Sequence, residues 1–199
     1  NRLNFQITYR YLTINNSAGL NLTATVAVSN TLTMTAGDVT TGANILALSN
    51  PLVGSLTRVS GTIIGKLRRS VNTTLLTDYM FPVGTSGFYR PAIMNFSALA
   101  SGTDITAEFI AASPGALIPY SDGSVNLNNI FTEGYWRFSS SATPAATYSL
   151  KLTGNGFSSY TVNEMTRITG RDNGNTTWRG LGSHGTWTGV DITRIWVTN

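Results

Sequence analysis

Apolar and polar side chains alternate without a break from residue 3 to residue 11, in the run Leu-Asn-Phe-Gln-Ile-Thr-Tyr-Arg-Tyr. Successive side chains of a β-strand point to opposite faces, so this period of two predicts a strand. A strand with so apolar a face has to dock, either in its own domain or on a neighbouring copy. The face would carry Leu3, Phe5, Ile7, Tyr9 and Tyr11.

Residues 12–57 have a shorter rhythm, in which two apolar residues flank one small or polar residue. Asn, Ser and Gly separate these pieces, as in Thr41-Gly42-Ala43-Asn44. Repeated short strands and tight turns predict a small β-solenoid, and a meander of short strands is the alternative. The pieces are Leu12-Thr13-Ile14, Leu20-Asn21-Leu22, Val26-Ala27-Val28, Leu32-Thr33-Met34 and Ile45-Leu46-Ala47-Leu48.

The predicted strands lengthen, and aromatic residues multiply, from about residue 58 onward. Turn sequences such as Gly84-Thr85-Ser86-Gly87 and Ser121-Asp122-Gly123 separate them, which predicts a β-sandwich or jelly roll. Only the stretch from Val125 to Phe131 has the pattern of a short helix. We therefore expect an all-β chain that folds as one compact unit. Its parts would be an N-terminal strand (1–11), a solenoid-like segment (12–57) and a sandwich (58–199).

The composition and charge of the chain limit the classes of partner and site that it can have. Only 11% of the 199 residues are charged, whereas about 25% is usual in soluble proteins. The net charge is +4, and the basic residues are scattered apart from Lys66, Arg68 and Arg69, so nucleic acid is not an expected partner. The chain has no cysteine, which excludes disulfides and thiolate zinc sites. No apolar run reaches the roughly 18 residues that a membrane-spanning helix needs.

A series of short motifs resembles a known family. The chain is similar to a recurring module of very large surface and secreted proteins of the Bacteroidota, which are often exported by the type IX system. The resemblance covers about residues 12–155. It implies a short β-solenoid that leads into a β-sandwich, with surface display or adhesion and without defined catalytic residues. Besides the pieces above, the motifs are Gly61-Thr62-Ile63-Ile64-Gly65-Lys66-Leu67-Arg68, Phe81-Pro82-Val83-Gly84-Thr85, Tyr89-Arg90-Pro91 and Gly134-Tyr135-Trp136.

No set of residues with the spacing of a catalytic or metal site stands out. The single histidine, His184, lies in a Gly/Ser loop that is typical of a surface. Asp104 and Glu108 would share one strand face, as a glycoside-hydrolysing pair needs, but a solvated face explains them better. The run from Asp172 to Asn175 has too few carboxylates for calcium and suits a tight turn. We therefore expect no enzyme activity, no cofactor and no metal.

Two tryptophans are candidates for glycan binding, because aromatic faces stack on sugar rings. Trp178 and Trp187 lie in a polar, Gly-rich stretch where neighbouring Asn and Asp residues could bind hydroxyl groups. Trp136 is expected in the core. Packing between the two sheets is the alternative for all of the tryptophans.

Two functions follow from these patterns. The first is a structural subunit of an extracellular filament or surface layer, in which residues 3–11 of one copy add a strand to the sheet of the next, head to tail. The alternative is an adhesin module of a larger surface protein, which binds polysaccharide or another cell through the sandwich loops. The chain begins at Asn1 without methionine, which fits a processed or partial exported product, so we expect it outside the cell or at the cell surface.

Overall fold

The computed structural model describes residues 7–117 and 119–198. Within them all regular structure is β apart from one 3-10 turn, which confirms the expected all-β class. The stretch from Val125 forms a strand and no helix, so the helix expected there is absent. The elements are β1 (Ile7–Asn15), β2 (Leu20–Asn21), β3 (Val26–Ala36), β4 (Val39–Leu48), η1 (Val53–Ser55), β5 (Leu56–Arg58), β6 (Ile63–Val71), β7 (Asp78–Phe81), β8 (Gly84–Thr85), β9 (Phe88–Tyr89), β10 (Ala92–Leu99), β11 (Thr103–Ile110), β12 (Tyr120–Asp122), β13 (Val125–Leu127), β14 (Tyr135–Ser140), β15 (Ala146–Thr153), β16 (Ser183–Thr188) and β17 (Asp191–Thr198).

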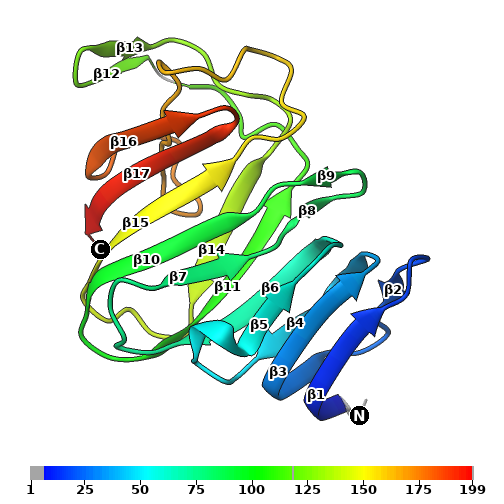
Figure 1. Ribbon diagram of the computed structural model, residues 1–199. Coiled ribbons are helices and arrows are strands. Elements are labelled where there is room, and N and C mark those ends of the chain that lie inside the picture. Colours follow the sequence, from blue (N-terminus) through cyan, green and yellow to red (C-terminus); the bar gives the residue numbers. More distant parts are fainter. Residues whose placement is uncertain (1–6, 118, 199) are drawn as a thin grey trace.

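The N-terminal third is a three-sided parallel solenoid (Figure 1). Each coil places a strand segment directly on the same segment of the next coil, which is the arrangement that the short repeated pieces predict. The parallel pairing begins at Ile7 and continues to Arg69, so the solenoid extends beyond residues 12–57 on both sides. The stacked columns on the three faces are Ile7, Val26, Leu46 and Leu67; Leu12, Leu32 and Leu56; and Leu20, Val39 and Ile63.

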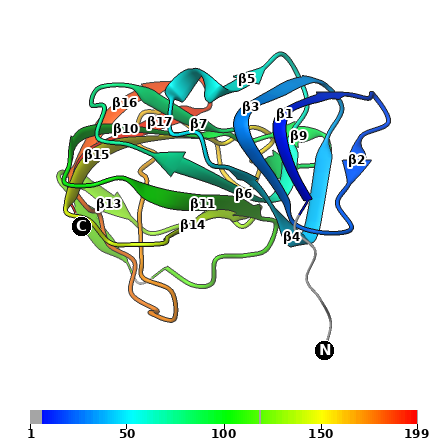
Figure 2. The ribbon, with the colours of Figure 1, turned by 90° about the horizontal axis from the view of Figure 1, so that it is seen from below.

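The sheet of the solenoid runs without interruption into a β-sandwich. Strand β6 pairs parallel with β4 on one edge and antiparallel with β11 on the other, and β11 pairs with β14. A second, antiparallel sheet in the order β16-β17-β15-β10-β7 faces this end of the first sheet (Figure 2). A single cluster of buried side chains extends from Ile14 in the solenoid to Ala146 in the sandwich. The two parts therefore share one core.

Buried arginines connect segments that lie far apart in the sequence. Arg69 is 1% exposed and donates hydrogen bonds to the carbonyls of Met80 (2.7 Å) and Val53 (3.1 Å), which fixes β7 and η1 to the last coil. Burial lowers the pKa of Arg69 to about 10, so the guanidinium is still charged at neutral pH. Trp136, expected in the core, is partly buried: it packs against the core cluster and donates a hydrogen bond to the carbonyl of Arg90 (2.8 Å).

A long segment without named strands, residues 154–182, joins β15 to β16 and covers one side of the sandwich. Glu133 binds its first turn: the carboxylate accepts hydrogen bonds from the Ser159 hydroxyl (2.7 Å) and from the backbone N–H groups of Ser158 and Ser159. Burial alone would raise the pKa of Glu133, but these hydrogen bonds outweigh it and lower the pKa to about 2. The carboxylate thus stabilises the fold in its ionised form.

We expect Glu133→Gln to lower the melting temperature at pH 6 and to leave it unchanged near pH 2. The folded-state pKa lies below the ordinary 4.5, so the contribution is complete above about pH 4.5 and is lost as the pH falls toward 2. Melting curves by circular dichroism across this range measure it. Glu164→Gln, at an exposed glutamate of the same covering segment, serves as the control. A loss of equal size at pH 6 and pH 2 would contradict the assignment.

Candidate functional site: the open end of the solenoid

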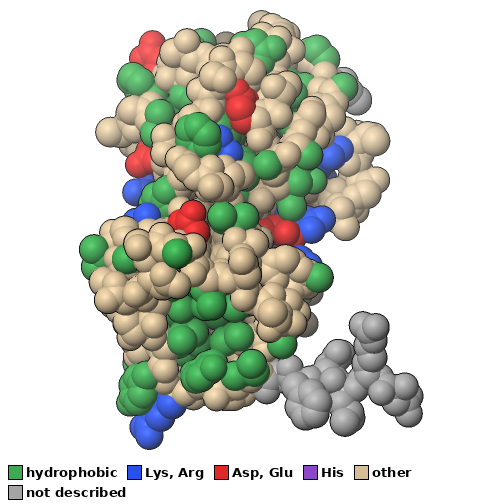
Figure 3. Space-filling view, turned by 90° about the vertical axis from the view of Figure 1, so that its right-hand side faces the viewer, with side chains coloured by type: hydrophobic (Ala, Val, Ile, Leu, Met, Phe, Trp, Pro, Cys, Tyr) green, Lys and Arg blue, Asp and Glu red, His purple; other side chains and the backbone are tan. Residues whose placement is uncertain are grey.

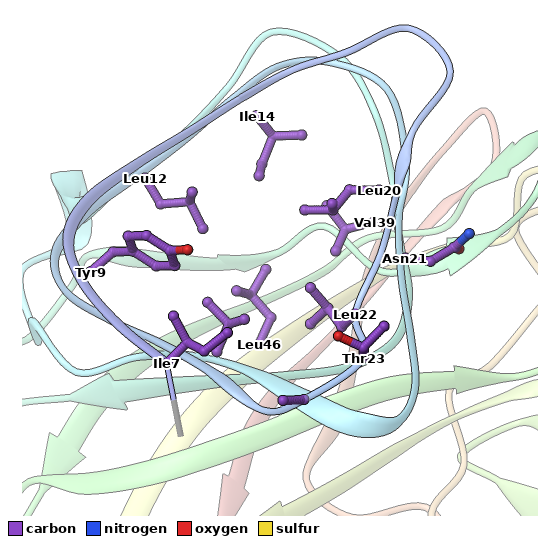
Figure 4. Close-up of a pocket in the computed structure, with 12 residues that line it drawn as sticks. Ile7, Tyr9, Leu12, Ile14, Leu20, Asn21, Leu22, Thr23, Val39 and Leu46 are labelled. Carbon is purple, nitrogen blue, oxygen red and sulfur yellow. The ribbon is translucent and has the colours of Figure 1, made fainter. Parts of the chain in front are cut away.

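The first coil of the solenoid, formed by β1 and β2, has no strand on its outer side in the part of the chain that the structure describes. Within the described residues β1 pairs only with β3 and β2 only with β4, so both lie at the edge of the large sheet. Viewed down the axis, the chain encloses a ring of inward-pointing side chains (Figure 4). The same end forms a hollow in which hydrophobic side chains gather on the surface of the molecule (Figure 3).

The side chains at this end occupy core positions that are left uncovered. Ile7 is 42% exposed, whereas Val26, which stacks under it, is 7% exposed. Leu20 is 39% exposed, whereas Val39 below it is fully buried. The columns continue as buried residues through the next coils, so the exposure arises from position in the stack. Terminal repeats of solenoid proteins usually need a polar cap, and this coil lacks one in the described residues.

The hollow at the open end has a volume of about 180 Å³ and an uncharged lining. Leucine, isoleucine, valine and alanine provide most of its wall, and Tyr9, Asn21 and Thr23 provide the polar atoms. None of these groups can act as a nucleophile activated by a base, and none has the charge that binds a metal. The surface is therefore suited to packing against another apolar layer.

The residues of the expected assembly strand lie in different environments in the structure. Leu3 and Phe5 lie outside the described residues. Ile7 and Tyr9 point into the open end (Figure 4). Tyr11 points outward: it is 61% exposed, and its hydroxyl accepts a hydrogen bond from Asn30 (3.2 Å).

A register shift in the β1–β3 pairing between Tyr9 and Tyr11 causes this reversal. An irregularity of one residue turns every later side chain to the other face, which brings Leu12 and Ile14 inside. The single apolar face expected for residues 3–11 is therefore wrong for Tyr11: among the described residues, Ile7 and Tyr9 share a face and Tyr11 does not. Residues 7–15 also pair with β3 of their own chain along their whole length, so this strand is held in place and is not free for donation to a neighbour.

The two candidate glycan-binding tryptophans lie in different environments. Trp178 is only 9% exposed, and the guanidinium of Arg171 lies over its ring at 4.6 Å. Trp187 is 42% exposed on β16 and donates to the carbonyl of Gly189 (2.7 Å). Trp178 is thus buried, but it lies in the segment between β15 and β16 and outside the core cluster between the sheets. The sequence could not separate the two residues, because both follow polar, Gly-rich runs.

The acidic residues that could serve catalysis are engaged with neighbouring basic and hydroxyl groups. Asp104 accepts a hydrogen bond from Ser70 (2.5 Å) and lies 4.0 Å from Arg68, and Glu108 is bound by Arg137. Asp172 pairs with Arg179 (2.9 Å) beside a turn. In residues 7–117 and 119–198 no three metal-binding side chains come together, and no helix there is long and apolar enough to cross a membrane.

The sequence predicts the strands of the open end, but it does not show that this end of the solenoid is uncovered. The pieces Leu12-Thr13-Ile14 and Leu20-Asn21-Leu22 have the same spacing as the buried pieces that follow them, so nothing in the pattern marks the first coil as uncovered. Only the stacking order provides that information. No protein-family model, curated protein or solved structure matches the chain, so function has to be argued from this surface.

Proposed function

We propose that the protein is a structural module of an assembly outside the cell, and that two copies join through the open ends of their solenoids. The observation that carries the proposal is the set of core positions on the first coil, Ile7, Tyr9 and Leu20, that remain about 40% exposed. The low content of charged residues fits an extracellular structural role better than a cytoplasmic one.

A second copy is the partner that best fits this end. The surface to be covered is the cross-section of a β-solenoid, and its complement is an apolar layer of similar outline with a strand edge of its own. The open end of another copy has both properties. Its apolar, uncharged lining also offers no charge that would select a different kind of partner.

The symmetry of the contact follows from the other end of the solenoid, which is already covered. Strand β6 pairs with β11, and Ile63 forms a parallel bridge with Val83, so the sandwich caps the last coil. An open end therefore cannot stack on the closed end of the next copy. The contact available to it is between two identical surfaces, which closes as a two-fold dimer. Larger structures would need a second contact elsewhere on the molecule.

We expect the double variant Ile7→Asn with Leu20→Asn to weaken self-association by at least about 100-fold, because each copy loses two large apolar contacts. Sedimentation equilibrium measures the dissociation constant. Both residues are substantially exposed in the single chain, so the fold tolerates the change, and circular dichroism verifies this.

The matched control is Val59→Asn with Leu76→Asn. These residues are 76% and 75% exposed and lie outside the lining of the open end. The control removes as many exposed apolar side chains and should associate like the unmodified chain. A protein that sediments as a single chain at high micromolar concentration, or one that both double variants affect equally, would contradict the proposal.

A further inference from the structure

A second cavity lies inside the sandwich, far from the open end in the fold. It has a volume of about 660 Å³ and lies between β14 of the first sheet and β15 and β17 of the second, under the covering segment 154–182. Small-molecule sites typically have volumes of about 300–1,000 Å³ and combine apolar walls with a few polar groups. Long segments without regular structure over such a site often serve binding.

The walls of the cavity are mainly aromatic and aliphatic. Trp136, Phe138, Leu150, Phe157 and Val197 contribute side chains from both sheets and from the covering segment. Phe157 lies 5.7 Å from the ring of Trp136 and 6.2 Å from that of Phe109, so it joins the cavity wall to the sandwich core. These walls favour a ligand with an apolar body.

Two buried hydrogen-bond donors at this cavity have no acceptor in the protein. They are Nε1 of Trp178 and Nε of Arg167, and both residues line the cavity. The side chain of Arg167 is 10% exposed and that of Asp122, the carboxylate nearest to it, is 14% exposed. Asp122 Oδ2 lies 3.7 Å from Arg167 Nε, which is too long for a hydrogen bond. Unpaired buried donors are rare and call for an explanation.

Charge counting at the same place indicates an anion. Asp122 already accepts two hydrogen bonds from Arg194, which is 2% exposed. Two guanidinium groups therefore share one carboxylate. The charges of this group also act on His184: burial, followed by the charge of Arg167, lowers the pKa of His184 and favours the neutral ring. Of the other arginines at the cavity, Arg137 pairs with Glu108 and Arg179 with Asp172. Arg171 donates hydrogen bonds to two carbonyls, and Arg167 Nη1 likewise donates to the carbonyls of Glu164 and Thr166. Two positive charges, those of Arg167 and Arg171, therefore have no carboxylate of their own, and Arg167 also keeps a buried Nε without an acceptor.

We propose that the cavity binds an amphipathic carboxylate, with the apolar body between the sheets and the carboxylate paired with Arg167. A ligand oxygen accepts the hydrogen bond of Trp178 Nε1. The ligand class is that of long-chain fatty acids and related apolar acids. This binding function is independent of the association of the solenoid ends.

Titration with cis-parinaric acid, whose fluorescence rises in apolar sites, tests the proposal. We expect saturable binding of one molecule per chain, displacement by palmitic acid, and displacement at least about tenfold weaker by the uncharged 1-hexadecanol, because charged hydrogen bonds are the stronger ones. Absence of saturable binding, or equal displacement by the acid and the alcohol, overturns the proposal.

Variants locate the site. Trp178→Phe keeps an aromatic ring and removes the N–H that has no partner in the protein, together with one ring of the indole. Circular dichroism verifies that the variant folds. We expect it to weaken binding of cis-parinaric acid by about fivefold, the effect of one hydrogen bond. Arg167→Met should abolish the preference for acid over alcohol.

Trp187→Phe is the control, since Trp187 does not line the cavity. It should bind like the unmodified chain. Should Arg167→Met fail to fold, the proposal is still tested by the preference of the unmodified chain for acid over alcohol and by the affinity of Trp178→Phe for cis-parinaric acid. Unchanged affinity in Trp178→Phe, or an equal loss in Trp187→Phe, contradicts the assigned site.

Discussion

Replacing Arg194 by methionine is expected to destabilise the fold by about 3–5 kcal/mol, because it leaves a buried carboxylate and two carbonyls without their donor. Arg194 lies on β17 and donates to Asp122 on β12 (2.9 Å for Nη2–Oδ1), to the carbonyl of Leu181 (2.6 Å) and to that of Gly182 (3.0 Å). It thereby ties the β12–β13 hairpin and the end of the covering segment to the second sheet. Urea unfolding followed by circular dichroism measures the loss.

Arg179→Met is the matched control for this prediction. Arg179 also pairs with an aspartate, Asp172, but the two side chains are 51% and 72% exposed. Exposed ion pairs contribute about 0–1 kcal/mol, so this variant should unfold close to the midpoint of the unmodified chain. Similar losses in the two variants would show that burial does not determine the contribution of these arginines.

The second large effect is expected at a corner of the solenoid, where glycines of successive coils stack. Gly37 has φ +88°, and a Cβ atom there would lie 1.7 Å from the carbonyl oxygen of Asn16 in the coil above. Gly61, with the same φ, stacks on the carbonyl of Gly37 in turn. Gly37→Ala must therefore separate two coils as well as adopt a strained backbone. We expect a loss of about 3 kcal/mol or more.

Gly42→Ala separates strain from overlap. Gly42 also has a positive φ, +57°, but a Cβ atom there would meet nothing within 4 Å. Its loss should be about 1 kcal/mol, the cost of the left-handed conformation alone. Both variants are compared by urea unfolding. If Gly37→Ala is no more destabilised than Gly42→Ala, the close stacking of the corner is not what stabilises the coils.

The sequence predicted the parts of this fold in which local pattern and packing agree. Short pieces such as Val26-Ala27-Val28 and Leu32-Thr33-Met34 form part of a solenoid strand with their apolar residues buried. Pattern alone could not choose between a solenoid and a meander, because both use short strands and tight turns. The two folds differ in strand pairing, because in a solenoid each strand pairs in parallel with the strand one coil later. Only the structure shows this pairing.

Features that depend on register or on distant residues could not be predicted. Tyr11 has the parity of Ile7 and Tyr9, and the irregularity that turns it outward has no glycine to mark it. Asp122 and Arg194 are 72 positions apart and meet only through the closure of the sandwich. The resemblance to Bacteroidota surface modules and the extracellular location remain predictions.

The central claim, that two copies join at the open ends of their solenoids, is tested most directly by distances between spin labels on the two copies. The chain has no cysteine, so Thr13→Cys and Thr57→Cys each provide a single labelling site. Thr13, Thr33 and Thr57 stack in one column on the same face, and Thr13 and Thr57 are exposed. Thr57 lies two coils farther from the open end.

Strands in neighbouring coils are about 4.8 Å apart, so each Thr57 label lies about 10 Å deeper than the Thr13 label on the same copy. An end-to-end dimer therefore predicts that double electron–electron resonance gives a distance between Thr57 labels that is longer than that between Thr13 labels by up to about 19 Å. The Thr13 variant should give the short distance only in the associated protein. No distance between copies at Thr13, or a shorter one at Thr57, would contradict the account.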